Sequence, residues 1–245
     1  MKHCMRRFAS ALAASCAVLL QAHAQTPASP PSATASAPAG PKIGPLKSLG
    51  QDRYQVGRIV VDKHAGTVTV PGRILVLDKP LEYLATSPGG KKAYESLLEL
   101  DASGSEMNLA CILAGLERDA DVPLWKPLVA AGRVGRRVSV TLTWADGAQR
   151  RRLSAAEALL GPEAAAKAGA FDWTYTGSFT SLDGSQLAAD VTGTLISFVK
   201  KDPTGIIEVA SDTELGPYGG VKGNPALPAE GTAIELVIQA APATK

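Results

Sequence analysis

The chain has 245 residues, of which 45% are apolar and 20% charged, and its formal net charge at pH 7 is +2. Because the two signs nearly balance and are interspersed, the sequence lacks the concentrated basic face that nucleic-acid binding needs. Of its three Cys and three His, only Cys111 and His64 lie beyond residue 24. An iron–sulfur cluster or a structural zinc site needs about four such ligands, so we expect neither a metal nor a cofactor.

The first 24 residues have the pattern of an export signal. A basic start precedes an apolar run over residues 8–20, and Ala22 and Ala24 supply the small side chains that a signal peptidase requires. The run is shorter than the ~20 apolar residues needed to cross a bilayer. We therefore expect a signal peptide over residues 1–24, a mature chain without a transmembrane span, and a periplasmic or secreted protein. Lipidation at Cys16 is the alternative, although it would leave an apolar run of only about seven residues.

Residues 25–49 are rich in Pro, Ala and Ser. This composition buries too little apolar surface to offset the entropy of ordering, and it predicts a disordered, extended tether. Residues 50–242 have the length and the mixed composition of one globular domain with its own core. The sequence thus predicts a signal peptide, a tether and a single folded domain.

Strand patterns dominate the folded part, with Gly and Pro between them. The strict alternation of apolar residues over 138–144 is typical of a strand buried on one face. The expected strands are Val56–Asp62, Thr67–Leu77, Leu81–Thr86, Tyr94–Asp101, Val138–Trp144, Gln149–Leu153, Trp173–Phe179, Val191–Val199, Ile206–Ala210 and Thr232–Ile238.

Two helices are indicated by a Ser followed three residues later by a Glu, at Ser103 and at Ser154. Cys111 falls on the apolar side of the first helix, and we expect it to be buried and unreactive. His64 falls between two expected strands, which predicts a solvated hairpin turn. Together these patterns predict an α+β fold, with a mainly antiparallel β-sheet, two or three short helices and a single domain.

A set of short motifs follows in a definite order over most of residues 56–240. They are Val60-Val61-Asp62-Lys63, Val68-Thr69-Val70-Pro71-Gly72, Lys92-Ala93-Tyr94-Glu95-Ser96-Leu97-Leu98, Leu113-Ala114-Gly115, Trp173-Thr174-Tyr175-Thr176-Gly177-Ser178, Ala189-Asp190-Val191-Thr192-Gly193 and Gly231-Thr232-Ala233-Ile234-Glu235-Leu236. In this order they resemble the YdjY-domain family of bacterial, often exported proteins of undefined activity. The resemblance implies a site with a His before the Glu-Ser pair and a second His opening the apolar helix. This chain has Tyr94 and Asn108 there, so of such a trio only Glu95 is present.

The polar and aromatic residues of the matching segments form the candidate site. They are Glu95, Ser96, Asn108, Trp144, Trp173, Tyr175 and Asp190. If Glu95 and Asp190 face each other in an aromatic-walled pocket, they can bind a polyol or sugar, or act as an acid–base pair. The alternative is structural: the tryptophans fill the core, Glu95 ends a strand and Asp190 caps a turn.

These patterns favour an exported, non-catalytic binding or accessory module whose partner is an unknown envelope protein or a small ligand. One alternative is a carboxylate-dependent hydrolase that acts on an envelope polymer or sugar. Another is a structural envelope protein that presents a sheet edge to its partner. No motif names a reaction, so catalytic residues are not assigned.

Overall fold

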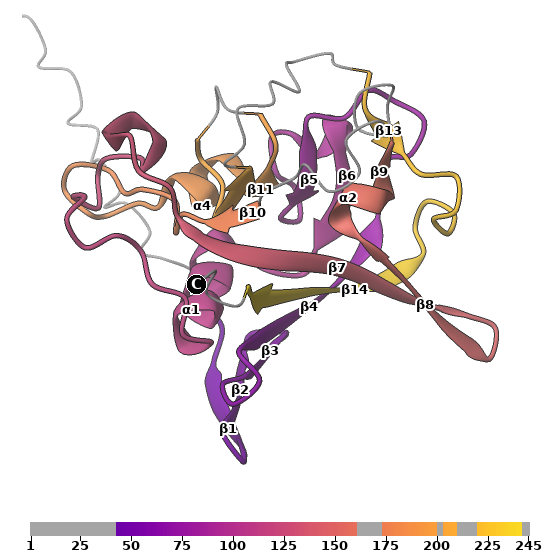
Figure 1. Cartoon of the computed structure of the whole chain (residues 1–245), viewed down its shortest axis with the longest axis horizontal. Helices are drawn as coiled ribbons and strands as arrows, with labels where there is room; N and C mark the ends of the chain where they lie inside the picture. Colours follow the sequence, from indigo (N-terminus) through magenta and orange to yellow (C-terminus); the bar gives the residue numbers. More distant parts are fainter. Residues whose placement is uncertain (1–42, 161–172, 200–202, 210–219, 242–245) are drawn as a thin grey trace, which may run out of the picture. The chain divides into compact units, whose positions relative to one another are not determined.

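The computed structural model describes residues 43–160, 173–199, 203–209 and 220–241 (Figure 1). The expected signal peptide, the alternative lipidation site at Cys16, and residues 25–42 of the expected tether lie outside these ranges. Among the described residues, no helix has both the length and the apolar character needed to cross a membrane.

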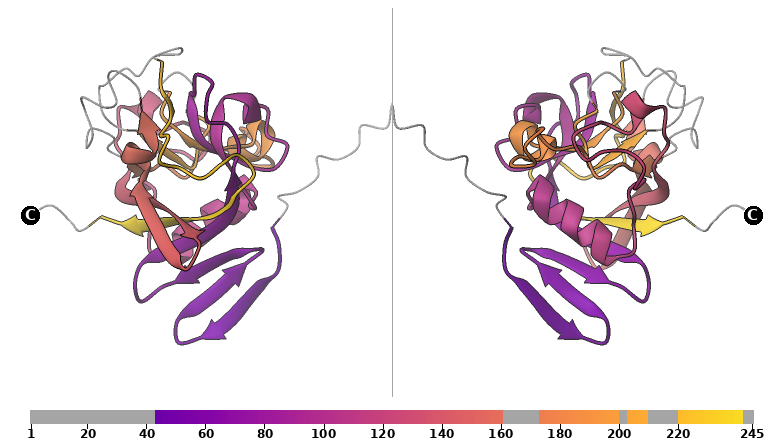
Figure 2. Two further views of the ribbon diagram at one scale, coloured as in Figure 1. Left: turned by 90° about the vertical axis from the view of Figure 1, so that its right-hand side faces the viewer. Right: turned by 90° about the vertical axis from the view of Figure 1, so that its left-hand side faces the viewer.

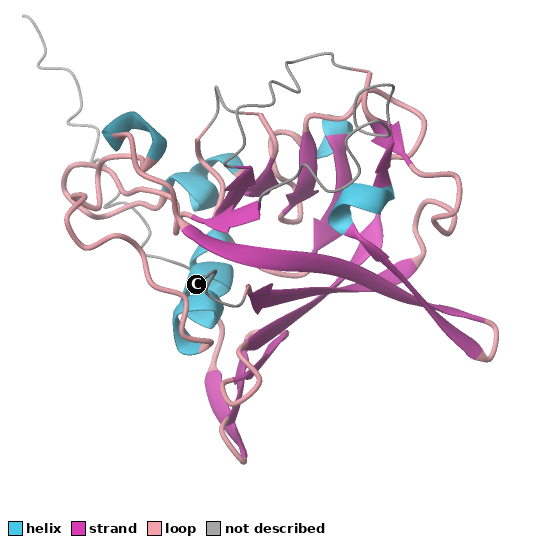
Figure 3. Ribbon diagram, viewed as in Figure 1, coloured by secondary structure: helices cyan, strands magenta, loops and turns pink. Residues whose placement is uncertain are grey.

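The central feature of the fold is a closed β-barrel (Figures 1 and 3). Around its wall the strands are, in order, β4 (Thr67–Ile74), β14 (Ala233–Ala240), β7 (Arg136–Asp146), β10 (Trp173–Tyr175), β12 (Ile207–Val209), β11 (Thr194–Ser197), β5 (Tyr83–Thr86) and β6 (Ser96–Leu100). Pairing of β6 with β4 closes this eight-stranded wall. Neighbouring strands are antiparallel except for the pairs β11–β12 and β5–β6.

The remaining elements lie outside the barrel wall. The further strands are β1 (Leu46–Gly50), β2 (Arg53–Val56), β3 (Ile59–Asp62), β8 (Gln149–Ser154), β9 (Leu159–Leu160) and β13 (Lys222–Gly223), and the helices are α1 (Gly104–Leu113), α2 (Ala155–Ala158), α4 (Ala188–Thr192) and the 3₁₀ turns η1 (Ala93–Glu95) and η2 (Val129–Ala131). Strands β1–β3 continue the sheet from β4 as an antiparallel meander (Figure 2). Helix α1 packs against β2, β3, β11 and α4.

Closure of the barrel depends on the second half of β4. Its first half pairs with β3, but from Gly72 onwards its partner on that side is β6. A side chain at position 72 would collide with the carbonyl oxygen of Glu99 and with Leu100. Pro71, which cannot donate a ladder hydrogen bond, marks the change of partner, and its carbonyl accepts from Asp101 N at 2.8 Å. The Pro-Gly pair therefore lets one strand serve both the meander and the barrel.

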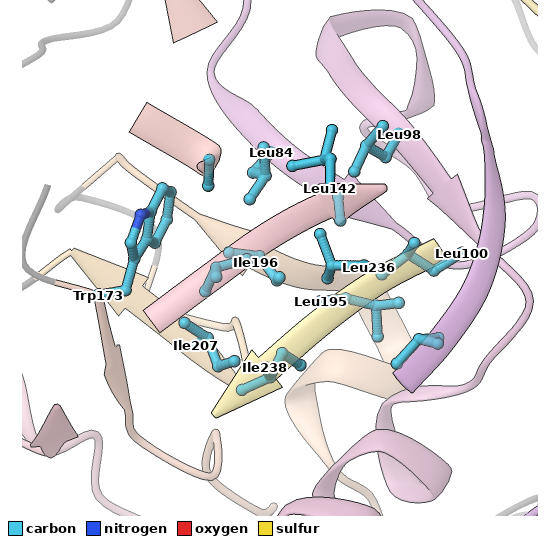
Figure 4. Close-up of a cluster of buried hydrophobic side chains, with 14 of the residues drawn as sticks. Leu84, Leu98, Leu100, Leu142, Trp173, Leu195, Ile196, Ile207, Leu236 and Ile238 are labelled. Carbon is cyan, nitrogen blue, oxygen red and sulfur yellow. The ribbon is translucent and has the colours of Figure 1, made fainter. Parts of the chain in front are cut away.

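Apolar side chains fill the inside of the barrel (Figure 4). The strand registers place Leu142 opposite Leu236 and Ile196 opposite Ile207, and all four are fully buried. Burial of one such side chain contributes roughly 1.5–3 kcal/mol. The described interior is therefore a packed core.

Both capping boxes that the sequence predicts are confirmed. Ser103 Oγ accepts from Glu106 N at the start of α1, and Ser154 Oγ accepts from Glu157 N at the start of α2. Cys111 is fully buried in α1, where burial raises the pKa of its thiol to about 12. His64 is exposed in the turn between β3 and β4, also as expected.

The structure refines the fold prediction. The strands of the expected, mainly antiparallel sheet form a closed barrel, because β6 returns to pair with β4. Periodicity along single strands contains no information on this long-range pairing. Order also begins before residue 50, since β1 pairs with β2 and Gly44 N donates to Glu106 Oε1 at 2.9 Å. The last residues of the range expected as a tether, from Leu46 onwards, thus belong to a paired strand.

Several expected strands are shorter than predicted, and two of them show why. The strand expected over 173–179 ends at Tyr175, because Gly177 and Ser178 have positive φ angles of 70° and 58°. The strand expected over 191–199 begins only at Thr194, after α4. Gly193 ends that helix in the left-handed conformation, with φ 78°, as is common at helix C-termini.

Candidate functional site

Two of the expected site residues contact Lys92. Glu95 Oε1 lies 2.8 Å from Lys92 Nζ, and Ser96 Oγ donates to the Lys92 carbonyl oxygen at 2.7 Å. The hydrogen bond to Glu95 is the main cause of the raised pKa of Lys92. The same ammonium lies 5.6 Å from the centroid of the Tyr83 ring, within the range of a cation–π contact. This local network joins η1 to the start of β6.

A second pair of expected residues is joined by a partly buried hydrogen bond. Tyr175 in β10 donates its hydroxyl hydrogen to Asn108 Oδ1 in α1 at 2.7 Å. Tyr175 is 1% exposed, and this burial is the main cause of the raised pKa of its phenol. The hydrogen bond therefore ties the helix to the barrel wall.

Asp190 lies on α4 and is exposed. Its Oδ1 accepts from Ser105 N at 2.9 Å, and its Oδ2 accepts a short hydrogen bond from Ser105 Oγ. Ser105 is in the first turn of α1, where a carboxylate satisfies free N–H groups and is favoured by the helix dipole. Asp190 thus bonds to α1, whereas Glu95 bonds to Lys92.

Both expected tryptophans are largely buried. Trp144 on β7 is 7% exposed and Trp173 on β10 is 4% exposed, and Trp173 lies beside the core residues of Figure 4. The structure therefore groups the expected site residues into separate contacts: Glu95 with Ser96 at Lys92, Asn108 with Tyr175, and Asp190 with Ser105. None of the seven lines either of the two cavities found among the described residues.

One of these cavities lies on the outer side of the barrel wall, over β10, β12 and β11. Its volume is about 200 Å³. We call it the outer cavity, and its lining residues are Val129, Gly132, Arg133, Val134, Gly135, Thr174, Thr176, Ser197, Val199, Glu208 and Val209. The second cavity is a wide surface hollow at the start of α1, and its walls include the ion pair between Arg58 and Asp101.

The strand register explains the polar floor of the outer cavity. Glu208 pairs with Thr174 on one side and with Ser197 on the other, so these three side chains share one face of the sheet. The next residues, Ile207, Tyr175 and Ile196, pair with one another on the opposite face. The wall is therefore polar towards the cavity and apolar towards the core.

The threonine hydroxyls of this floor already use their hydrogens. Thr174 Oγ1 donates to the Glu208 carbonyl oxygen at 3.2 Å, and Thr176 Oγ1 donates to the Gly205 carbonyl oxygen at 3.1 Å. Glu208 is 7% exposed, and its Oε1 accepts from Gly205 N at 3.2 Å. The hydroxyl oxygens of Thr174 and Thr176 keep lone pairs that can accept further hydrogen bonds.

The other wall of the cavity comes from η2 and the residues after it. Gly135 packs so closely against the Tyr175 carbonyl oxygen that a side chain would not fit, which holds this segment on the barrel. Arg133 forms ion pairs with Asp119 at 3.3 Å and with Asp121 at 3.8 Å. Val134 is 65% exposed at the rim.

Arg118 organises the loop that leads to η2. Its guanidinium donates to the carbonyl oxygens of Val122 at 2.6 Å and of Lys126 at 2.5 Å. Partial burial lowers the pKa of Arg118. Because one planar cation binds several carbonyls, the loop has a defined path although it has little regular secondary structure.

The sequence analysis did not select the residues of this floor. Glu208 interrupts the otherwise apolar run Ile206-Ile207-Glu208-Val209. A charged residue in such a run is unusual, and it could have indicated a functional position. The polar residues Thr174 and Thr176 alternate with the aromatic residues Trp173 and Tyr175, which were selected instead. Among the described residues, no group of three or more His, Cys, Asp or Glu side chains converges to hold a metal ion.

The family model of the YdjY domain matches residues 59–239, which include all the barrel strands except the last residue of β14. No curated protein and no solved structure matches the chain.

Proposed function

The chain belongs to the YdjY-domain family, and we propose that it is an exported, non-catalytic binding module that takes a small ligand in the outer cavity. One observation carries the proposal: a defined cavity with a polar floor and apolar walls lies on the outside of a barrel whose interior is filled. Small-molecule sites commonly combine apolar walls with a few oriented polar groups.

The export pattern of residues 1–24 supports a periplasmic or secreted location. Fractionation of cells that produce the full chain, followed by mass determination of the mature protein, tests this location. Cleavage after Ala24 is expected, and a lipid-modified mass starting at Cys16 would contradict it.

Binding is favoured over hydrolysis by the contacts of the carboxylates. General acid–base hydrolysis by a carboxylate pair requires two such groups on either side of the bond to be cleaved. Glu95 bonds to Lys92 and Asp190 bonds to Ser105, while Glu208 is the one carboxylate among the described lining residues of the outer cavity.

A thermal-shift screen with small amines, carboxylic acids, alcohols and sugars tests the proposed function. Val134→Phe should block the cavity rim and abolish the shifts, because Val134 lines the cavity. The matched control is Val191→Phe, since Val191 is also exposed, at 46%, and does not line the cavity. Equal shifts in both variants would contradict binding in the outer cavity.

The sequence analysis predicts that seven other residues contact a ligand, and the same screen tests this prediction. It is repeated with Glu95→Gln, and Glu99→Gln is the control because Glu99 also pairs with a cation, Arg73. Loss of binding in Glu95→Gln alone would place the ligand near Lys92 instead of the outer cavity.

A further inference from the structure

Strand β1 forms a free edge of the sheet. We propose that two copies of this chain pair antiparallel through β1, so that the sheets of the two copies become continuous. This inference is independent of the proposed ligand site. In the order of the strands β1 lies at the end of the meander away from β4, and no residue of β1 lines the outer cavity.

The first argument is that β1 is exposed and has a neighbour on one side only. It pairs with β2, and no other strand in the described part of the chain pairs with it. All five of its residues are exposed, including Leu46 at 54% and Leu49 at 47%. Figure 1 shows β1 as the outermost strand of the meander. An exposed apolar edge of this kind is a template for pairing with another strand.

The second argument is the direction of the backbone groups. The carbonyl oxygen of Pro45, just before β1, accepts from Gly57 N at 3.4 Å and therefore points towards β2. Backbone groups alternate in direction from one residue to the next along an antiparallel ladder. The N–H and C=O groups of Leu46 and Ser48 therefore point away from β2. The free edge thus offers donors and acceptors at alternate residues, as strand addition requires.

The third argument is that charge selects a register for the pair of copies. If the two-fold axis passed through Lys47, the two Lys47 side chains would lie opposite each other, and like charges in that position destabilise a sheet. With the axis at Ser48, the outward groups of the two Ser48 residues bond to each other, and Lys47 lies opposite Leu49 of the second copy. The apolar stem of Lys47 then covers Leu49. Each contact occurs twice, as an isologous interface requires.

A second free edge, β8, has the opposite character. Its one partner among the described strands is β7, and it carries Arg150, Arg151 and Arg152 in succession. Charged side chains protect an edge strand from pairing, and two copies of β8 would bring like charges together. Strand β1 contains a single charged residue, Lys47. The sequence thus protects one edge and leaves the other open to a second copy.

The strength of the dimer is limited by the length of β1. Interfaces below about 1,200 Å² are typical of weak complexes, and one short strand pair belongs to this class. We therefore expect a dissociation constant between about 10 μM and 1 mM.

The test is sedimentation equilibrium of the mature protein over this range of concentrations. We expect the mean mass to rise from that of one chain towards that of two. Leu49→Lys should weaken the dimer about tenfold or more, because it places a Lys opposite Lys47 on both sides of the axis. The control is Leu124→Lys, since Leu124 is also exposed, at 64%, and lies outside β1. The mass of one chain at every concentration would overturn the proposal, and so would equal dimerisation of the natural sequence and Leu49→Lys.

Disulfide trapping tests the register. Ser48→Cys places two thiols opposite each other across the axis, with a Cα–Cα distance of about 5.5 Å, which a disulfide can span. Cys111 is the one Cys beyond residue 24 and is fully buried, so it does not compete. Mild oxidation should yield covalent dimers of Ser48→Cys but few of Gln149→Cys, the control on β8.

Equal cross-linking of the two Cys variants would overturn the pairing through β1. Hydrogen exchange identifies another occupant of the edge. If the amides of Leu46 and Ser48 are protected in a protein that stays monomeric, another segment of the same chain covers β1, and the proposal fails.

Discussion

Ile207 and Glu208 are neighbours on β12, but they lie on opposite faces of the barrel wall and have opposite surroundings. Ile207 is fully buried among core residues such as Ile196 (Figure 4). Glu208 belongs to the floor of the outer cavity, together with Thr174 and Ser197. The comparison shows how a three-stranded section of wall has two different faces: the inner face stabilises the fold, and the outer face places polar groups on the floor of the cavity that we propose as a ligand site.

The largest expected effect is on the inner face. Ile207→Ala should lower the free energy of unfolding by about 2–5 kcal/mol, because it removes buried methyl groups and leaves a cavity. Urea denaturation measures this loss. If Ile207→Ala lowered the free energy of unfolding no more than Glu208→Gln does, the inner face would not stabilise the fold more than the outer face.

Tyr175→Phe probes the same face through a polar contact. It removes the hydrogen bond to Asn108 Oδ1 and should cost about 0.5–1.5 kcal/mol. A double-mutant cycle with Asn108→Ala, followed by urea denaturation, isolates the pair energy. A coupling energy near zero would show that the hydrogen bond does not join α1 to the wall.

Arg118→Met probes the support of the outer face. Loss of the guanidinium bonds to Val122 and Lys126 should increase hydrogen exchange of the loop over residues 122–128, with little change in the core strands. It should also weaken ligand binding, because this loop leads to the cavity wall at η2. Exchange that rises equally in the loop and in β7 would instead indicate global destabilisation.

The smallest expected effect is the contribution of Tyr175 to the free energy of unfolding, which changes only at alkaline pH. Because folding raises the pKa of Tyr175 above its ordinary value of 10.0, the folded protein keeps this proton when the unfolded chain loses it. The resulting stability is present below pH 10 and decreases as the pH rises above 10. Unfolding free energies measured from pH 8 to 11 should therefore fall more steeply for the natural sequence than for Tyr175→Phe. Parallel curves would contradict the raised pKa.

Much of the fold could be predicted because its signals are local. The alternation over 138–144 is the pattern of β7, and the Ser-Glu spacings at Ser103 and Ser154 are true capping boxes. Barrel closure could not be predicted, since it depends on Gly72 meeting Glu99 and Leu100 from a distant part of the sequence. The pairing of short parallel strands such as β11 and β12 could not be predicted either, because no tight turn in the sequence marks it.

The outer cavity was harder to predict for a related reason. Its floor joins residues from β10, β11 and β12, and only the register between these strands places Thr174, Ser197 and Glu208 side by side. The wall from Gly132 to Gly135 has no periodic pattern. Sequence analysis favoured Trp173 and Tyr175 because aromatic residues often line binding sites, whereas in this strand their threonine neighbours line the cavity.

The most direct test of the division between the two faces is chemical-shift mapping with the strongest ligand from the thermal-shift screen. Backbone amide shifts of the ¹⁵N-labelled protein are compared with and without that ligand. The account predicts that the largest changes occur at Thr174, Thr176, Ser197 and Val209. Changes centred on Glu95 and Ser96, or on Asp190, would contradict it and would place binding at the residues first selected from the sequence.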